Sequence, residues 1–464
     1  MIATLFVLSK NLLGQGQTDE AIVYSIVGPY DEYRTAPIIY IKTKVHFSDD
    51  WISGFTEAQR QARVQGIFSN LNQAFNPHGI YFLAEDNACN TPNSFTYHPF
   101  DSDVVSSADI GTTSTDWLNI CDYGPAGNPF GSAIQIPNNF LEVTGTDLGN
   151  TPPVHAAILI HEVGHCLGLA HTHHDEGCHD DLLGCEDPLA DDCYCCEDYV
   201  CDIDLNPDHG IEANADCSHP TLPENIVRNY MSYVTPGNCR DLFTDEQVMR
   251  MRAYLQEAPI LLPIQLENTT VPANAPSSIS GNIIVEEDYT ISSPLEMLPG
   301  ATIWVKRGAT LWVHSTITGA CGQMWQGIIV DGTTAGAQTT TNQGKVVVYS
   351  QGKIEHAKVG IDVQNTDELG NPLNTTGGGI VKVAFGQFVN NTIGIRFMPY
   401  HWTSSGGQTV ANASNLISAN FSTTDDYRGE DAQVTHLDLN QIAGLNISGG
   451  KLRDLRTVCT KPAY

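Results

Sequence analysis

The chain has 464 residues, with 22 Lys or Arg against 53 Asp or Glu and a formal net charge of −31. Hydrophobic residues make up 41% of it, which excludes disorder by composition. The length predicts two or three domains. So negative a charge argues against nucleic acid and anionic membranes as partners and favours cations, either metal ions or basic polypeptides. No apolar run approaches the roughly 20 residues that span a bilayer.

The N-terminus carries an incomplete secretion signal. Residues 1–17 contain a short apolar run, Met1–Leu8, but no basic residue precedes it and Lys10 follows it. This pattern is typical of a secretory signal that has lost its charged start, and the alternative is an ordinary buried N-terminal segment. Residues 18–35 are then expected to form a short N-terminal or pro segment.

The cysteines are concentrated in one stretch. Seven of the 13 fall between Cys178 and Cys217, a density typical of disulfides formed in an oxidising compartment. The alternative is a zinc–thiolate cluster around Cys193, Cys195 and Cys196, but no second CxxC pair stands at zinc-finger spacing. A secreted, extracellular protein is therefore predicted.

Residues 36–258 mix strand and helix patterns and are expected to form the first domain. Apolar alternation or β-rich runs predict four strands, at Ile38–Phe47, Gly79–Leu83, Trp117–Ile120 and Ala133–Pro137. Helical spacing predicts three helices, at Phe55–Phe75, Val154–Leu169 and Asp245–Leu255. Thr56 with Gln59 has the pattern of a capping box. The stretch Cys178–Asp216 has almost no periodicity and is expected to be a long, crosslinked, acidic loop.

The pattern changes in the second half of the chain. Prolines punctuate residues 259–275, which are expected to be a linker. Residues 276–464 then carry short β-branched runs with Gly and Asn at the corners, and no helix-period segment interrupts them. Such repetition predicts a β-solenoid and resembles right-handed parallel β-helix domains. A β-sandwich is the alternative fold.

One segment, VHAAILIHEVGHCLGLAHTHH from Val154 to His174, has metal-ligand spacing. His161 and His165 are four residues apart, which places both imidazoles on one helix face. Glu162 is adjacent, where its carboxylate can take a proton from a metal-bound water. Gly168 can end the helix with a positive φ and turn the chain back, so that His171 becomes a third ligand. Three protein ligands leave one position open, as catalytic zinc requires.

The full pattern HExxHxxGxxH is the metzincin signature, and further motifs resemble the pappalysin-like (cytophagalysin) branch of that clan. These are Asn229–Tyr233 (NYMSY), Cys239, and the helix start Phe243–Met251 (FTDEQVMRM). The resemblance covers about residues 36–256. It implies an α+β catalytic domain with a mixed twisted sheet and an active-site helix. It also implies a secreted zinc metalloendopeptidase acting on protein or peptide substrates.

The resemblance also implies roles for single residues. Met231 would form a hydrophobic floor under the zinc ligands, and Tyr233 would stabilise the oxyanion. Ala133–Pro137 would be the edge strand to which substrate adds as an antiparallel strand. Cys217 and Cys239 bracket the methionine turn and are the best candidates for a disulfide. His173 and His174 are expected to be exposed loop residues.

Some features depart from the family pattern. Calcium binding through Asp198, Asp202 and Asp204 is predicted from the acidic insert, with a solvated acidic loop as the alternative. Relatives that prefer a basic residue after the cleaved bond use acids near the methionine turn, and none follows Tyr233 here. No cysteine precedes Cys89, so a pro-segment cysteine on zinc is not expected.

Two other functions remain open. In one, the β-solenoid carries the main role as a carbohydrate-binding or adhesion module in contact with glycans or a cell surface, an argument from fold analogy. In the other, the metzincin is catalytically silent and serves adhesion. The intact Glu162 argues against the second, because a purely structural zinc shell does not need that carboxylate.

Overall fold

The computed structural model describes residues 21–22, 26, 28–33, 37–100, 115–124, 130–133, 135–144, 153–173, 198–203, 212, 215–219, 222–234, 239–366, 372–373, 377–430 and 434–454. The chain divides into two compact units, Met1–Leu266 and Glu267–Tyr464. None of the described helices is long and apolar enough to cross a membrane. Asp204 and His174 lie outside the described residues.

The first unit is built on a mixed sheet in the order β3-β2-β5-β8-β6. Its strands are β2 (Ile39–Ser48), β3 (Ile80–Ala84), β5 (Leu118–Asp122), β8 (Phe140–Thr144) and β6 (Phe130–Ser132). All neighbours run parallel except β6, which is antiparallel to β8 and forms one edge. The short β4 (His98–Phe100) pairs with the end of β2.

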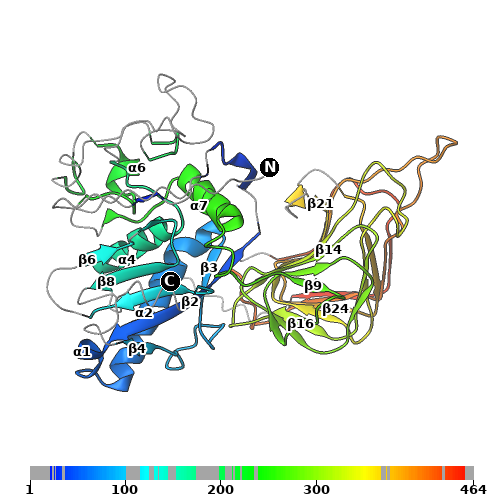
Figure 1. The fold of residues 1–464 in the computed structure, drawn as a ribbon. Helices are drawn as coiled ribbons and strands as arrows, with labels where there is room; N and C mark the ends of the chain where they lie inside the picture. The colour runs from blue at the N-terminus through cyan, green and yellow to red at the C-terminus, as the bar shows by residue number, and fades with distance from the viewer. Residues whose placement is uncertain are drawn as a thin grey trace, which may run out of the picture. The chain divides into compact units, whose positions relative to one another are not determined.

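Helices pack against this sheet and in a second apolar cluster beside the last of them. They are α1 (Asp49–Ile52), α2 (Glu57–Phe75), α4 (Pro153–Cys166), α6 (Glu224–Val227) and α7 (Asp245–Glu257), with 3-10 turns η1 (Asp31–Tyr33) and η2 (Asn76–His78). The predicted capping box of α2 is confirmed, because Thr56 and Gln59 exchange side-chain-to-backbone hydrogen bonds. In Figure 1, α4 lies alongside β8 and β6, so the edge of the sheet borders the helix that carries the HExxH motif.

The expected edge strand was misplaced. Ala133–Pro137 does not extend the main sheet. Instead β7 (Gln135–Ile136) pairs in parallel with β1 (Ala21–Ile22), and β6 is the edge. The physical reason is local: the backbone N–H of Ala133 bonds to the Glu162 side chain instead of continuing the ladder, and Pro137 has no N–H to offer a sheet.

A second apolar cluster lies around α7 and includes residues from the expected N-terminal or pro segment. Tyr30 and Tyr33 are buried there with Val200, Ile226 and Met249. The Tyr30 hydroxyl accepts a hydrogen bond from Arg250. Residues 28–33 therefore pack into the same unit as the HExxH helix.

The second unit is a parallel β-helix with three sheets of stacked strands, and this excludes the β-sandwich. One sheet holds β10 (Ile279–Ser280), β13 (Leu295–Met297), β16 (Thr316–Gly319), β19 (Lys353–Glu355), β24 (Gln387–Val389), β27 (Asn420–Thr423) and β30 (Lys451–Asp454). The next holds β9 (Thr269–Val271), β11 (Ile283–Val285), β14 (Thr302–Val305), β17 (Trp325–Val330), β20 (Ala357–Val363), β25 (Ile393–Phe397) and β28 (Thr435–Leu439). The third holds β12 (Tyr289–Ile291), β15 (Thr310–Val313), β18 (Lys345–Val348), β23 (Ile380–Ala384), β26 (Asn415–Ile417) and β29 (Asn446–Ser448). The hairpin β21 (Asn365–Thr366) and β22 (Pro372–Leu373) stands apart from these.

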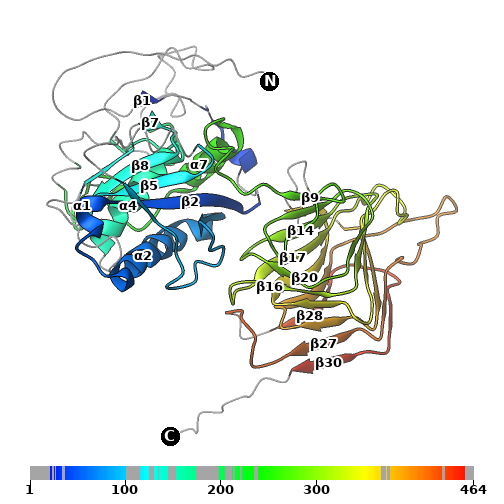
Figure 2. The same cartoon turned by 60° about the horizontal axis from the view of Figure 1, so that its bottom comes forward.

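Apolar residues at equivalent positions of successive turns stack to form the solenoid core. In one sheet the register pairs a continuous ladder of aliphatic side chains, namely Ile303, Ile328, Ile361, Ile395 and Leu437. Figure 2 shows β9, β14, β17, β20 and β28 of this sheet following one another along the stack. Each turn thus buries its apolar face only against its neighbours, as in other repeat folds.

The stretch expected to be a linker, 259–275, is divided between the two units. Leu261 and Ile264 are fully buried in the core of the first unit. Thr269–Val271 forms β9, the first strand of the solenoid. The prolines lie in turns, but the stretch is not a free linker. Its apolar residues are buried, Leu261 and Ile264 in the first unit and Val271 in the second.

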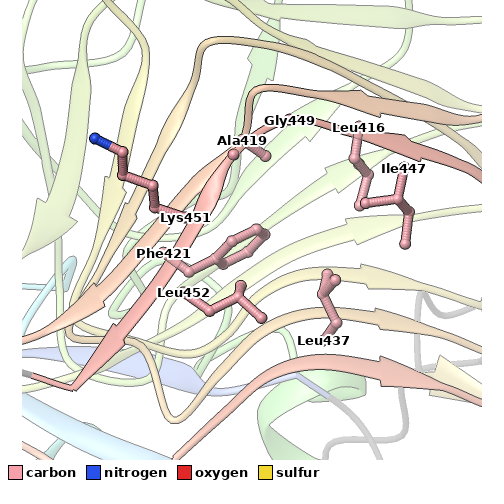
Figure 3. Close-up of a pocket in the computed structure, with 9 residues that line it drawn as sticks. Leu416, Ala419, Phe421, Leu437, Ile447, Gly449, Lys451 and Leu452 are labelled. Carbon is pink, nitrogen blue, oxygen red and sulfur yellow. The ribbon is translucent and has the colours of Figure 1, made fainter.

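The last turns of the solenoid enclose an apolar pocket of about 260 Å³. Figure 3 shows Leu416, Phe421, Leu437, Ile447 and Leu452 gathered around it, with the Lys451 ammonium pointing away. The lining offers no converging polar groups of the kind that orient a ligand. The pocket is therefore an apolar hollow at the last described turns of the solenoid rather than a polar binding site.

Candidate active site

Helix α4 brings the first two histidines and the glutamate of the motif into the interior. His161, Glu162 and His165 are all buried. The helix ends at Cys166, and two residues later the φ of +101° at Gly168 lets the backbone turn, while the Leu169 N–H returns to the Gly164 carbonyl. This turn brings His171 back to the two helical histidines.

The three imidazoles converge through their Nε2 atoms. The His165 Nε2 lies 3.0 Å from those of both His161 and His171, and the latter two are 3.1 Å apart. The Nδ1 atoms of His161 and His165 lie 2.7 and 2.8 Å from the carbonyl oxygens of Tyr230 and Leu169. A carbonyl only accepts, so each Nδ1 carries the proton and each Nε2 presents a lone pair.

Three lone pairs at this separation repel one another unless a cation lies between them. Zinc bonds histidine nitrogen at about 2.0–2.1 Å and takes three protein ligands in its catalytic sites. The arrangement fits such an ion, and His161, His165 and His171 form a potential metal-binding group among the described residues. Burial, together with the charge that His165 would carry, lowers the pKa of His161. The neutral form that a metal requires is therefore favoured.

Glu162 lies between this cluster and the sheet edge. Burial raises the pKa of its carboxyl group to about 8, partly offset by the Ala133 N–H that bonds to it. Its Oε2 is buried and accepts no hydrogen bond from a described residue. A Cβ on Gly131 of β6 would come within 2.5 Å of Glu162 Cγ, so glycine is what lets the strand approach. A divalent cation at the histidines would lower this pKa and favour the basic carboxylate.

The methionine turn lies against the same helix. Met231 is fully buried, and its backbone N–H donates to Asn229 Oδ1 at 2.9 Å. A Cβ on Gly164 would lie 2.5 Å from Met231 Sδ, so the thioether touches α4 between Glu162 and His165 in sequence. Met231 thus packs against the histidine-bearing helix, and its role as a hydrophobic floor under the zinc ligands stays a prediction.

Tyr233 lies at the histidine cluster, packed among three imidazole rings. Its ring centroid is 4.7 Å from that of His171, 4.3 Å from that of His173 and 5.8 Å from that of His161. The expectation that His173 is an exposed loop residue was wrong, because it is 5% exposed and stacks on His171 with centroids 4.7 Å apart. The physical reason is a buried partner for its Nδ1, the carboxylate of Glu212.

Glu212 organises this part of the site and was not identified from the sequence. Its fully buried carboxylate lies 2.6 Å from His173 Nδ1, accepts from the Tyr233 N–H at 3.0 Å, and accepts from the Thr172 hydroxyl. It therefore joins the segment after the third histidine to the methionine turn. Nothing in the sequence distinguishes it from the 14 other acidic residues of Asp175–Cys217.

The acidic residues considered for calcium have other contacts. The Asp202 carboxylate accepts from the Thr244 hydroxyl at 2.8 Å and from the Glu246 N–H at 2.9 Å, at the N-terminus of α7. Asp198 is buried and its Oδ1 lies 3.5 Å from the Val200 nitrogen. Asp202 thus acts as a cap for α7, where a negative charge is favourable.

A disulfide joins Cys217 to Cys239, with Cα atoms 5.7 Å apart, as expected from their positions around the methionine turn. It ties the end of the acidic insert to the residue just before Arg240. Cys121 and Cys166 are buried and outside any disulfide, and the Cys166 thiol donates to the Phe140 carbonyl at 3.4 Å.

Comparisons with known proteins agree with this geometry. A family model, Peptidase_M43, described as pregnancy-associated plasma protein-A, matches residues 139–256. An extracellular metalloprotease of Aspergillus oryzae is 36% identical over 249 residues, covering 51% of this chain and 70% of the relative. One from Aspergillus fumigatus is 25% identical over 243 residues, covering 51% of this chain and 69% of the relative.

Among solved structures, mature mirolysin of Tannerella forsythia in complex with a cleaved peptide is similar at 22% identity and a TM-score of 0.32. The match covers 50% of this chain and 97% of mirolysin. A promirolysin mutant is similar at 23% identity and a TM-score of 0.31, over 51% and 88% of the two chains. TM-scores this low do not support conclusions about the active site.

The family match spans all of α4, the methionine turn and nearly all of α7, the elements around the histidine cluster. The similarity to the Aspergillus oryzae metalloprotease covers 70% of that protein, well beyond the range of the family model. The chain therefore belongs to the Peptidase_M43 family of pappalysin-like metalloproteases, which are metzincins.

Proposed function

We propose that this protein is a secreted zinc metalloendopeptidase. The observation that carries the proposal is the convergence of three histidine Nε2 atoms, 3.0–3.1 Å apart, beside the buried carboxylate of Glu162. His161, His165 and His171 would hold the zinc ion. The names of the Aspergillus relatives, which are called extracellular, support secretion.

When bound, zinc polarises the peptide carbonyl and lowers the pKa of its water ligand. Glu162 would take a proton from the attacking water and pass it to the leaving amine. Tyr233, packed against His171, would donate its hydroxyl to the oxygen that becomes negatively charged. Glu212 would hold the Tyr233 backbone in place through the hydrogen bond to its N–H.

The edge strand supports a mode of substrate binding. The strand β6 lies at the end of the sheet and its Gly131 borders Glu162. An extended peptide that pairs with β6 would run past the carboxylate and the histidine cluster. Substrate would thus add to Phe130–Ser132 rather than to Ala133–Pro137.

Metal removal tests the proposed activity. Treatment of the full chain with 1,10-phenanthroline is expected to lower casein hydrolysis more than 100-fold, because the ligand set alone cannot activate water. Adding zinc back is expected to restore hydrolysis, and mass spectrometry to find about one zinc per active chain. Full hydrolysis by metal-free protein would contradict the proposal.

Calcium remains a second proposed ion, with Asp198, Asp202 and Asp204 as ligands, and the contacts of Asp202 allow a direct test. We expect Asp202→Ala to lower the free energy of unfolding of the first unit by about 1–2 kcal/mol in calcium chelator, since α7 loses its cap. Denaturant titration with and without calcium measures this. Asp116→Ala, an exposed turn residue, is the control and should change stability by less than about 0.5 kcal/mol.

A calcium-binding role and a capping role for Asp202 predict different effects of calcium on stability. If calcium is bound there, added calcium will stabilise the wild type and not Asp202→Ala. If Asp202 only caps α7, the loss will be the same with and without calcium. No loss in either condition would overturn the capping role.

A carbohydrate-binding or adhesive role for the solenoid stays a prediction. The pocket at its last turns is apolar and gives no support to glycan binding.

A further inference from the structure

Four arginines are buried among the described residues of the first unit, and three of them have several donors engaged. Arg63 makes two hydrogen bonds to the carboxylate of Asp122. The others donate to oxygens of nearby residues, which are Gly168, Tyr30 and Tyr254 for Arg250, and Tyr33, His78 and Pro37 for Arg252. These three side chains are satisfied by the fold itself, as buried guanidinium groups usually are.

Arg240 is the exception. It is 8% exposed, and its single hydrogen bond to a described residue runs from Nη1 to the Ser232 carbonyl, at 2.6 Å. Its Nε is enclosed and has no acceptor among the described residues. No described carboxylate lies within ion-pair distance. An enclosed, poorly paired guanidinium is costly in free energy, so an arginine in this state calls for an anionic partner beyond the described residues.

The position of this arginine is at the active site. Ser232 lies between Met231 and Tyr233, so the Nη1 bond places the guanidinium on the methionine turn. Burial lowers the pKa of Arg240, and the nearby charges of Glu212 and Glu162 raise it. The disulfide of the preceding Cys239 holds the backbone in place.

The nearby acids do not neutralise this guanidinium by contact. Glu212 has its oxygens engaged by His173, Thr172 and Tyr233. Glu162 faces Ala133 and the histidine cluster. A zinc dication together with the described Arg240, Glu162 and Glu212 would carry a formal charge of +1. An additional negative group would balance it.

We propose that Arg240 binds a carboxylate of the substrate close to the scissile bond, and so selects an acidic residue or a free C-terminus. This rests on the proposed peptidase function and deepens it. The planar fork of arginine suits a carboxylate, since two parallel N–H donors meet its two oxygens. A lysine or arginine of the substrate at the same position would face like charge and be excluded.

The acidity of the whole chain does not argue against this. The net charge of −31 acts over long distances and is screened beyond about 8–10 Å in physiological salt. Selection of the residue at the cleaved bond depends on the group that touches it. Basic proteins can therefore be attracted to the surface and still be cut beside an acidic residue.

A peptide set tests the selectivity directly. One fluorogenic sequence carries Asp, Glu, Ala or Lys in turn at each of the three positions on either side of the cleaved bond, and a second series compares free and amidated C-termini. For the zinc-loaded wild type we expect kcat/KM for the carboxylate peptide to exceed that for the alanine peptide at least tenfold at one position. A preference seen in the first series means that Arg240 binds an acidic side chain. A preference for the free over the amidated C-terminus in the second series means that it binds the terminal carboxylate.

Variants assign the effect to Arg240. Arg240→Met, of similar length without charge, is expected to bring the ratio of carboxylate to alanine peptide close to one, and Arg240→Lys to leave an intermediate ratio. Circular dichroism establishes that each variant is folded, and Arg240→Gln replaces Arg240→Met if the latter does not fold. A wild-type enzyme indifferent to carboxylates, or a ratio that survives in the uncharged variant, would overturn the proposal.

A binding measurement separates this proposal from the peptidase function. Fluorescence anisotropy of the same peptides is measured on the zinc-loaded Glu162→Gln protein, with and without Arg240→Met. At least tenfold tighter binding of the carboxylate peptide, lost with Arg240→Met, supports recognition even if no cleavage is found. Cleavage without any such preference would leave the peptidase function standing and refute the role of Arg240.

Discussion

Glu162→Gln is expected to lower kcat for peptide hydrolysis by about 10²- to 10⁴-fold, the usual contribution of a positioned general base. Glutamine has almost the same shape and can still accept the Ala133 N–H, but its amide cannot take a proton from water. The three histidines are untouched, so bound zinc should stay near one per chain. Initial rates on a fluorogenic peptide, with zinc measured by mass spectrometry, check both statements.

The matched control is Glu142→Gln. Glu142 is a half-buried carboxylate on β8 whose pKa is also raised by burial, but its Oε1 is hydrogen-bonded to Tyr123 and it is not a histidine neighbour. We expect less than a threefold change in kcat from it. Equal cleavage by wild type and Glu162→Gln would refute the assigned role, and parallel losses in both variants would point to a general effect of removing buried carboxylates from this unit.

The ligand set was accessible from the sequence because its geometry is local. Two histidines four residues apart on a helix must share a face, and Gly168 is where that helix can turn. The positions of His161, His165 and His171 need no knowledge of distant parts of the chain. The same holds for the capping box at Thr56, which depends on residues three apart.

Residues held by distant contacts could not be identified in this way. Glu212 meets Thr172 and His173 across 39–40 residues and lies in a segment without periodicity. The isolation of Arg240 is visible only when its surroundings are assembled. Ala133 was assigned to a strand because its neighbours are β-formers, but the competing hydrogen bond to Glu162 ends the ladder before it.

In the solenoid, too, the sequence predicts what local patterns determine and misses what distant contacts determine. Short β-branched runs with Gly and Asn corners predicted stacked turns, because every turn repeats one local pattern. Its first strand was missed, since Thr269–Val271 lies among prolines and its pairing with Ile283–Val285 is what makes it a strand. Strand boundaries depend on the neighbouring turn, which no local pattern reveals.

Gly168→Ala is expected to destabilise the first unit by about 2–6 kcal/mol. Two costs add. The φ of +101° is unfavourable for any residue with a Cβ, and that Cβ would lie 2.4 Å from Tyr254 Cγ and 2.7 Å from both Cδ atoms. The ring cannot easily retreat, because Tyr254 is fully buried and its hydroxyl accepts hydrogen bonds from Arg250 and Ile26.

Gly308→Ala separates these two costs. Gly308 has a similar φ of +93°, in the solenoid, but a Cβ added there would meet nothing within 4 Å. Its variant should lose only the backbone part, about 1–3 kcal/mol, in the unfolding of the second unit. Denaturant unfolding of both variants measures the difference, and a loss in Gly168→Ala no larger than in Gly308→Ala would contradict the packing argument.

The same substitution should weaken zinc binding, because Gly168 fixes the path from His165 to His171. Its carbonyl accepts the Arg250 Nε at 2.8 Å, and displacement from the Tyr254 ring would pull on that bond. A shift of the third histidine changes a site whose nitrogens are only 3.0–3.1 Å apart. Competition with a chelator of known affinity is expected to show at least tenfold weaker zinc binding in folded Gly168→Ala, and wild-type affinity in Gly308→Ala. Wild-type affinity in both would mean that the turn matters for stability alone.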